Sequence, residues 1–348
     1  MARAHSGNPA ASLHIQNMYA NSVLFSGLGS LVLNGQEITI ITQHHKQTIS
    51  NLQRLIPLTP RAVIFFLAGT LPGEAFLHLR QLSIFGMVSR LPSNVLNSHG
   101  QNIFSYTTSS SKSWFIQIRD LCLQYGLPHP ANLLQHPPEK EAFKILAKKH
   151  VIDYWEQKLR SEAAPLDSLE FFHPEFMSLT RSHPLWRTAA ASPTKVVMAT
   201  QQARFLSGRY RTEVLCSHWS QNPQGYCKLS PDCCQTPEDT RHILQYCPAL
   251  SATREKLAIF TSSYSISHPE VATIIQMYCK TECRLFCQFV LDCSVLPAVI
   301  AAVQTHGEVI LEHLFNVTRI WVYALHRDRL KILGRWRNFG KSWNSKQT

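Results

Sequence analysis

The stretch 306-HGEVILEHLFNVTRIWVYALHRDRLKILG-334 decides the fold class, because its apolar residues recur with the spacing of an α-helix. Successive steps of 4, 3, 4 and 3 residues make one continuous apolar seam. The seam consists of Ile310, Leu314, Val317, Trp321 and Ala324. Gly334 follows it, and glycine commonly ends a helix. We therefore expect a long helix that begins near His306 and buries this seam against other helices.

Helical patterns bounded by proline or glycine occupy most of the remaining chain. Proline cannot continue a helix, and glycine readily adopts the left-handed conformation that ends one. The further helices expected are 36–56, 62–68, one that Pro72 opens, 113–125, 139–159, 194–206, 248–262 and 270–293. The sequence therefore predicts a mainly α fold.

Changes in composition divide the chain into four regions. We expect a helical domain at 1–126, a proline-rich connector with one helix at 127–193, a helix followed by a Cys/His module at 194–262, and a C-terminal helical region with a basic tail at 263–348. The connector contains eight prolines. Its expected packing anchors are Phe171, Phe172, Phe176 and Trp186.

The net charge of +12 at pH 7 is concentrated near the C-terminus. Residues 316–348 carry eight basic side chains and one acidic side chain, hence +7, and the other 315 residues carry +5. Such a segment is typical of contact with nucleic acid or an anionic surface, although it also suits a tail that only keeps a protein soluble. With 45% hydrophobic residues the chain has enough apolar surface to fold, which excludes a disordered protein.

A segment rich in cysteine and histidine follows the helix expected at 194–206. In 225-GYCKLSPDCCQTPEDTRHILQYC-247 the spacing is C-x5-C-x8-H-x4-C. The candidate ligands are Cys227, Cys233, His242 and Cys247. A structural zinc ion takes four such ligands in a tetrahedron, and with all four from protein no position remains for a catalytic water. The segment therefore predicts one structural zinc (Zn) site.

Other uses of the same residue types remain open. Cys233 and Cys234 are adjacent, so either can be the second ligand, and Cys216 with His218 could supply a substitute. The residues are also compatible with buried free thiols and a histidine that caps a helix. Small thiols are common in cores, and we expect three further cysteines there, on one helical face: Cys279, Cys283 and Cys287.

No motif in the chain supports catalysis. The sequence contains no H-E-x-x-H, no G-x-x-x-x-G-K-[ST], no G-x-S-x-G and no Asp-Asp dipeptide, so we expect no enzymatic activity. The N-terminal region lacks the hydrophobic core of a signal peptide, and its most apolar stretch, 23–33, is interrupted by glycine and too short to cross a bilayer. We expect an intracellular protein of the nucleus or cytoplasm that makes no membrane contact.

Several motifs give the chain a resemblance to the non-LTR (LINE-type) retrotransposon reverse transcriptases. Three of them resemble the cysteine-rich tail of that family: 206-LSGRYRTE-213, His218-Trp219-Ser220, and Glu238-Asp239-x-x-His242-Ile243-Leu244-x-x-Cys247-Pro248-Ala249-Leu250. The region from 23–28 through 79–86 is similar to the helical thumb that follows the palm, and 125–128 and 325–336 fit the same tail. The similarity covers nearly the whole chain and is most specific in 206–250.

The resemblance implies a C-terminal part of such a protein, with a thumb-like helical domain and a zinc-knuckle-like module. The palm aspartates of the family, including its [FY]-x-D-D turn, and its endonuclease are absent from these 348 residues, which implies a non-catalytic part. The implied partner is RNA or single-stranded DNA, with arginines on phosphate and aromatic rings on bases. The implied contacts are Arg209, Arg211, Trp219, Tyr226, Arg319, Arg327, Arg335 and Arg337.

Two other interpretations remain compatible with the sequence. The chain can be the tail of an RNA-directed DNA polymerase that acts only when a separate palm is supplied. It can also be an all-helical interaction protein, or the remnant of a decayed element. The sequence leaves the oligomeric state and the identity of the nucleic-acid target open.

Overall fold

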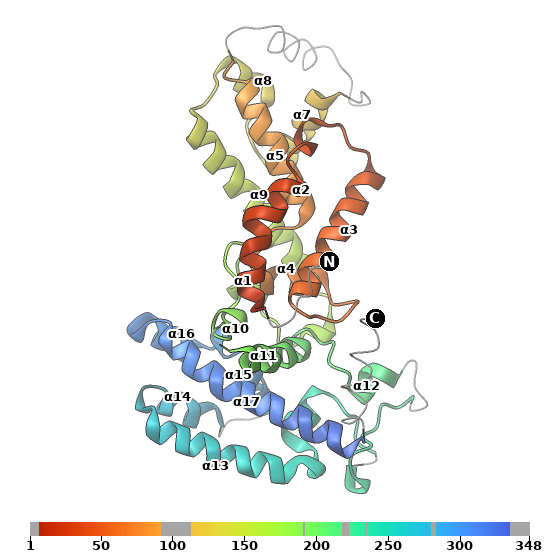
Figure 1. Ribbon diagram of the computed structural model, residues 1–348, viewed down its shortest axis with the longest axis vertical. Helices are drawn as coiled ribbons and strands as arrows, with labels where there is room; N and C mark the ends of the chain where they lie inside the picture. Colours follow the sequence, from red (N-terminus) through yellow and green to blue (C-terminus); the bar gives the residue numbers. More distant parts are fainter. Residues whose placement is uncertain are drawn as a thin grey trace.

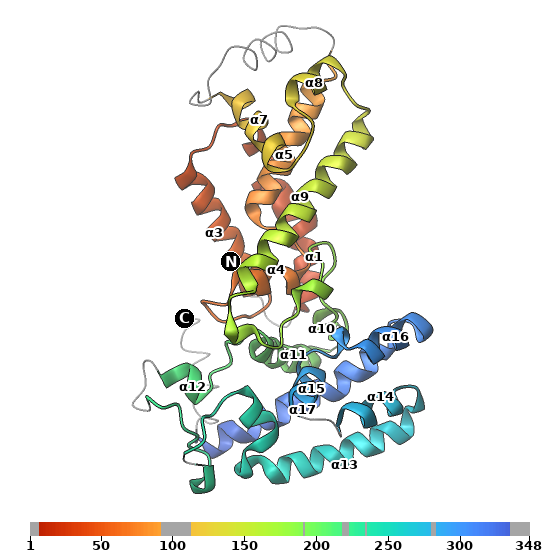
Figure 2. The same ribbon diagram turned by 180° about the vertical axis from the view of Figure 1, so that it is seen from behind.

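The structure is a computed structural model that describes residues 7–91, 113–190, 192–217, 223–233, 235–279 and 283–334. These residues are mainly helical and contain no strand, so the predicted mainly α fold is confirmed. Figures 1 and 2 show an elongated molecule with two stacked halves. The chain passes from the upper half, which holds α1 to α9, into the lower half, which holds α10 to α17.

Helices of the upper half begin and end at the residues that signal helix ends. Asn34 and Glu37 form a capping box at the start of α3 (Gly35–Leu52), in which each side chain accepts the other residue's backbone N–H. α4 (Arg61–Ala68) ends at Gly69, whose φ of 61° is left-handed. The other helices are α1 (Pro9–Ile15), α2 (Asn21–Leu24), α5 (Gly73–Val88), α7 (Trp114–Gln124), α8 (Pro130–Gln135) and α9 (Lys140–Ala163).

α4 lies in the core of the upper half. Its residues from Val63 to Leu67 are at most 1% exposed, so the helix is covered on all sides, with α3 and α9 among its neighbours. A polar chain crosses the same core. The Trp155 indole donates to the Tyr125 hydroxyl at 3.1 Å, and that hydroxyl is hydrogen-bonded to Nδ1 of His78 at 2.6 Å. These contacts satisfy polar atoms that would otherwise be buried without partners.

The segment predicted as a connector with one helix contains three α-helices, namely α8, α9 and α10 (Pro184–Arg187). The expectation of a single helix is therefore corrected. α9 packs against α4 and α5 and belongs to the upper half, so only the part after Ala163 connects the halves. Of the expected anchors, Phe171, Phe172 and Trp186 are buried, whereas Phe176 is 59% exposed.

The two halves meet where the connector passes the ends of α3 and α4. The Trp186 indole donates to the side chain of Gln53 at 3.0 Å, and the His183 N–H donates to the carbonyl of Leu67 at 3.1 Å. At Gly69 the backbones come so close that a Cβ would lie 2.0 Å from the carbonyl carbon of Arg181. Glycine at this position therefore serves both the left-handed turn and the close approach.

α17 (Val309–Ile332) forms the centre of the lower half (Figure 1). Its predicted apolar seam is confirmed, since four of the five seam residues are at most 6% exposed and Ala324 is half-buried. The helix expected at 270–293 is divided into two, and the helix at 297–306 was not predicted. The helices that pack against α17 are α11 (Pro193–Leu206), α13 (Ser251–Ser267), α14 (Pro269–Cys279), α15 (Cys283–Leu291) and α16 (Pro297–His306).

Within the described part of the chain, no single helix has the length and apolar character needed to span a membrane. α4 and α5 meet that test only when taken together, as a pair bent by 63°.

Gly69→Ala is expected to lower the free energy of unfolding by at least about 2 kcal/mol. A left-handed alanine costs roughly 1–2 kcal/mol, and its Cβ would also collide with the backbone at Arg181. Urea unfolding followed by circular dichroism measures the change. Gly35→Ala is the matched control, because no atom lies within 4 Å of its Cβ position at the start of α3. Equal stability of the two variants would contradict the importance of this junction.

His45 on α3 is completely buried against aromatic rings. Phe25, Phe65 and Phe76 lie within 6.0 Å of its ring, centroid to centroid, and neither ring nitrogen has a hydrogen-bond partner. Burial, with a smaller contribution from the charge of His44, lowers the pKa of His45 from 6.5 to about 4. The unfolded chain therefore binds a proton at a higher pH than the folded protein does.

This difference predicts that acid weakens the fold between pH 6.5 and pH 4. The contribution of neutral His45 to the free energy of unfolding is fully present above pH 6.5. It decreases as the pH falls towards 4, by up to roughly 3 kcal/mol. Urea unfolding at several pH values should show that the free energy of unfolding depends less steeply on pH for His45→Leu than for the wild type. His14→Leu, at an exposed position, should leave the dependence unchanged. Parallel profiles for His45→Leu and the wild type would disprove the assignment.

Candidate metal centre

The predicted ligand segment begins with a loop that closes on itself. An isolated antiparallel bridge pairs Tyr226 with Pro237, and Gly225 starts the loop with a left-handed φ of 67°. A Cβ on Gly225 would come within 2.7 Å of the backbone of α12 (Glu213–Cys216), so the loop packs directly on that helix. We call residues 225–238 the knuckle loop. It carries two of the predicted ligands, Cys227 and Cys233.

The other two ligands lie at the ends of one short helical segment. The Asp239 carboxylate accepts the backbone N–H of His242 at 2.7 Å, and His242 is the first residue of η7 (His242–Tyr246), a π-helical turn. Cys247 follows directly, and its N–H donates to the carbonyl of His242 at 2.7 Å. The Arg254 guanidinium donates to the carbonyl of Cys247 at 2.6 Å and fixes the end of the turn.

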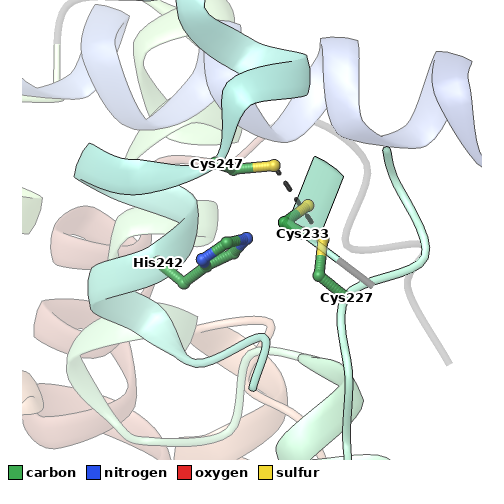
Figure 3. Close-up of side chains that lie close together, drawn as sticks. All are labelled: Cys227, Cys233, His242 and Cys247. Atoms are coloured by element: carbon green, nitrogen blue, oxygen red, sulfur yellow. Dashed lines mark hydrogen bonds between the residues drawn. The ribbon is translucent and has the colours of Figure 1, made fainter. Parts of the chain in front are cut away.

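Figure 3 shows the four predicted ligand side chains converging in one cluster, which we call the Cys/His cluster. One ligand atom of each lies within 4.8 Å of all the others, and each residue is at most 4% exposed. The Sγ atoms of Cys227 and Cys247 are 3.9 Å apart. Two thiolates on a tetrahedral zinc ion lie about 3.8 Å apart. The structure brings Cys233 into the cluster, whereas Cys234 lies outside the described residues.

The polar atoms of the cluster fit a metal ion. Both ring nitrogens of His242 are buried without a hydrogen-bond partner, which is costly unless something else binds one of them. Burial raises the pKa of the thiols of Cys227 and Cys247 and lowers that of His242. The Leu229 N–H donates to the Sγ of Cys227 at 3.5 Å, a bond that favours the thiolate. The four residues could therefore hold a metal ion, and three sulfurs with one nitrogen suit zinc.

Two residues that were not among the predicted site residues, Glu238 and Arg329, connect the cluster to α17. Glu238 is fully buried, and its carboxylate contacts the Sγ of Cys227 at 3.7 Å and the guanidinium of Arg329. Burial by itself would lower the pKa of Arg329, but the neighbouring Tyr210 and Glu238 outweigh it and raise the pKa. The two partners are 91 residues apart in sequence, so no local pattern could have revealed the pair.

The residues expected to contact nucleic acid differ in how far they are exposed. Arg211 and Tyr226 are exposed, and Arg209 is half-buried. Arg327 is exposed on α17 and lies 3.2 Å from the Asp328 carboxylate. Three expected contacts lie outside the described residues: Trp219, Arg335 and Arg337.

Arg319 is a core residue, which corrects the expectation that it contacts phosphate. It is 1% exposed, and its guanidinium donates to the carbonyls of Leu185 and Thr188, each at 3.3 Å, and to the Thr188 hydroxyl. Burial lowers the pKa of Arg319 to about 10. A guanidinium enclosed and bonded in this way cannot reach a bound phosphate.

The remaining cysteines do not form a second metal cluster among the described residues. Cys287 is buried and Cys279 half-buried, in line with the core positions expected for them. Cys216 is half-buried and does not join the Cys/His cluster, and its suggested companion His218 lies outside the described residues. The structure does not describe the side chain of Cys283.

Comparison with family models, curated proteins and solved structures finds no match to this chain.

Cys233→Ser is expected to abolish zinc binding, because a tetrahedral site that loses one of its thiolates binds zinc far more weakly. Elemental analysis of protein purified in the presence of zinc measures the metal content per chain. Cys234→Ser is the matched control and should retain the metal. Loss of zinc in both variants, or in neither, would contradict the choice of Cys233 as the ligand.

Proposed function

We propose that this chain is a non-catalytic nucleic-acid-binding protein whose Cys/His cluster holds a structural zinc ion. The convergence of four buried ligand side chains carries the proposal, because zinc knuckles of this kind are a common RNA-binding module. The resemblance to the C-terminal tail of non-LTR reverse transcriptases favours the same partner. We propose RNA or single-stranded DNA, since base stacking needs unpaired bases.

The bound zinc would cross-link the knuckle loop to η7. Four protein ligands would complete the coordination of such an ion, so no position on it would remain open for a substrate or a water. The role of the ion is then mechanical. It holds the loop and the segments bonded to the loop in one arrangement.

Side chains suited to nucleic acid belong to segments bonded to the knuckle loop. The Val214 N–H donates to the carbonyl of Glu238 at 3.3 Å, which fixes the segment that contains the exposed Arg211. Tyr226, in the loop itself, is 36% exposed, and Tyr246 of η7 is 58% exposed. A guanidinium can contact a phosphate while an aromatic ring stacks on an unpaired base.

The last turns of α17 add positive charge close to the cluster. Arg329 is bonded to Glu238 of the knuckle loop, and the neighbouring Arg327 and Lys331 have side chains that are 44% and 54% exposed. These residues belong to the segment 316–348, which carries +7. Sequence-independent contacts between such residues and phosphates make binding strongly dependent on salt.

Arg211→Gln is expected to weaken binding of single-stranded RNA several-fold at low salt. One lost phosphate contact should also reduce the slope of log Kd against log salt concentration by about 0.7. Fluorescence anisotropy of a labelled oligonucleotide, titrated with zinc-loaded protein at several salt concentrations, measures both quantities.

The matched control is Arg181→Gln. Arg181 is also exposed but pairs with Glu308 at the opposite end of α17, about 30 Å along the helix from Arg329. This variant should bind like the wild type. Zinc-loaded wild-type protein that binds neither RNA nor single-stranded DNA at low salt would overturn the proposed function.

A further inference from the structure

Glu238 lies between the Cys/His cluster and α17. Its carboxylate contacts the Sγ of Cys227 on one side and Arg329 on the other, and its Oε1 also accepts the Glu213 N–H at 3.1 Å. Its backbone closes the knuckle loop, because the Glu238 N–H donates to the carbonyl of Gly225 at 2.9 Å. The position of the carboxylate is therefore set by the same loop that carries two of the four ligands.

Arg329 is the residue through which α17 reaches this loop. It is 2% exposed, and its guanidinium lies 5.5 Å from the centre of the Tyr210 ring. Tyr210 in turn stacks on Phe205 of α11, with ring centroids 3.6 Å apart, and its hydroxyl is hydrogen-bonded to Nδ1 of His326 at 2.9 Å. One connected set of buried side chains thus holds the last two turns of α17.

We infer that Glu238 is a positioning residue that couples metal loading of the Cys/His cluster to the docking of the last two turns of α17, residues 325–332. The inference rests on the proposed metal site and adds a regulated element to it. Neither a structural metal site nor an apolar helix seam by itself requires such a coupling.

The coupling follows from how the carboxylate is held. A shared metal ion would fix Cys227 to Cys247 and thereby fix the knuckle loop, whereas without it the loop depends only on its backbone hydrogen bonds and on the contacts of Glu238 and Lys228. A buried ion pair stabilises a fold only when its geometry is good, so a loosened loop weakens the contact between Glu238 and Arg329. Coupling between two sites is reciprocal. If metal binding strengthens the contact between Glu238 and Arg329 by some factor, loss of that contact must weaken metal binding by the same factor.

The basic end of α17 would respond to this coupling. Arg327 and Lys331 lie on the same two turns as Arg329, and both are exposed. Metal loading would therefore set the orientation of charges that the proposed function places near phosphate. Loss of the metal would affect binding without the removal of any basic residue.

Hydrogen exchange on the full chain tests the coupling directly. Removal of zinc with a chelator should speed amide exchange in residues 325–332 by about tenfold or more. Residues 309–318, which belong to the other end of α17, should exchange at an unchanged rate, and zinc added back should restore the protection. Unchanged exchange in 325–332 in protein shown to bind and release zinc would overturn the inference.

A variant of Arg329 provides the second measurement. Arg329→Gln leaves the buried Glu238 carboxylate unpaired beside the thiolate of Cys227. It should therefore lower zinc affinity roughly 10- to 100-fold, as measured by competition with a chromogenic chelator. Arg181→Gln, at an exposed position, is the matched control and should retain wild-type affinity. Wild-type zinc affinity in Arg329→Gln would overturn the inference.

Cobalt absorption separates this inference from the proposed metal site. Both the wild type and Arg329→Gln should show the spectrum of tetrahedral cobalt bound to thiolates when enough metal is added, since Arg329 is not a ligand. A wild-type protein that binds neither cobalt nor zinc would overturn the metal site, and the coupling with it. A normal spectrum with unchanged exchange in 325–332 would overturn the coupling alone.

Discussion

The lower half of the molecule depends on the burial of one helix, α17. Its apolar seam is covered by α11 and by α13 to α16, but apolar contacts alone tolerate small shifts along a helix. Two buried arginines remove that freedom. Arg319 bonds the carbonyls at α10, and Arg329 bonds Glu238 beside the Cys/His cluster. A buried guanidinium is stable only with its partners in place. The two arginines therefore fix the position of α17 along its own axis and its rotation about that axis.

The Cys/His cluster occupies the part of the molecule where regular structure is scarcest. Between α12 and α13 the described chain has only short turns and one isolated bridge, and the knuckle loop is rich in polar residues. A segment of this kind buries too little apolar surface to hold one conformation. Its order comes from Gly225, from Glu238 and, in the function proposed above, from a shared metal ion.

Helices with clear end signals could be predicted from the sequence, and others could not. The glycine at 69 and the apolar runs of α4 and α17 have local causes, so their positions follow from neighbouring residues. α16 (Pro297–His306) is apolar on most sides and shows no periodicity that would identify it. α9 was identified as a helix but placed in the connector, because proline content says nothing about which surface a helix packs against.

The sequence by itself determined the mainly α fold and the segment that carries the candidate metal ligands, since helix periodicity, helix ends and ligand spacing are local properties of the chain. The tertiary structure alone decided three further points. It brings Cys233 into the cluster, buries Arg319, and joins Glu238 to Arg329. The physical reason is the same in each case, because burial and pairing depend on which distant segments meet, and spacing along the chain does not encode that.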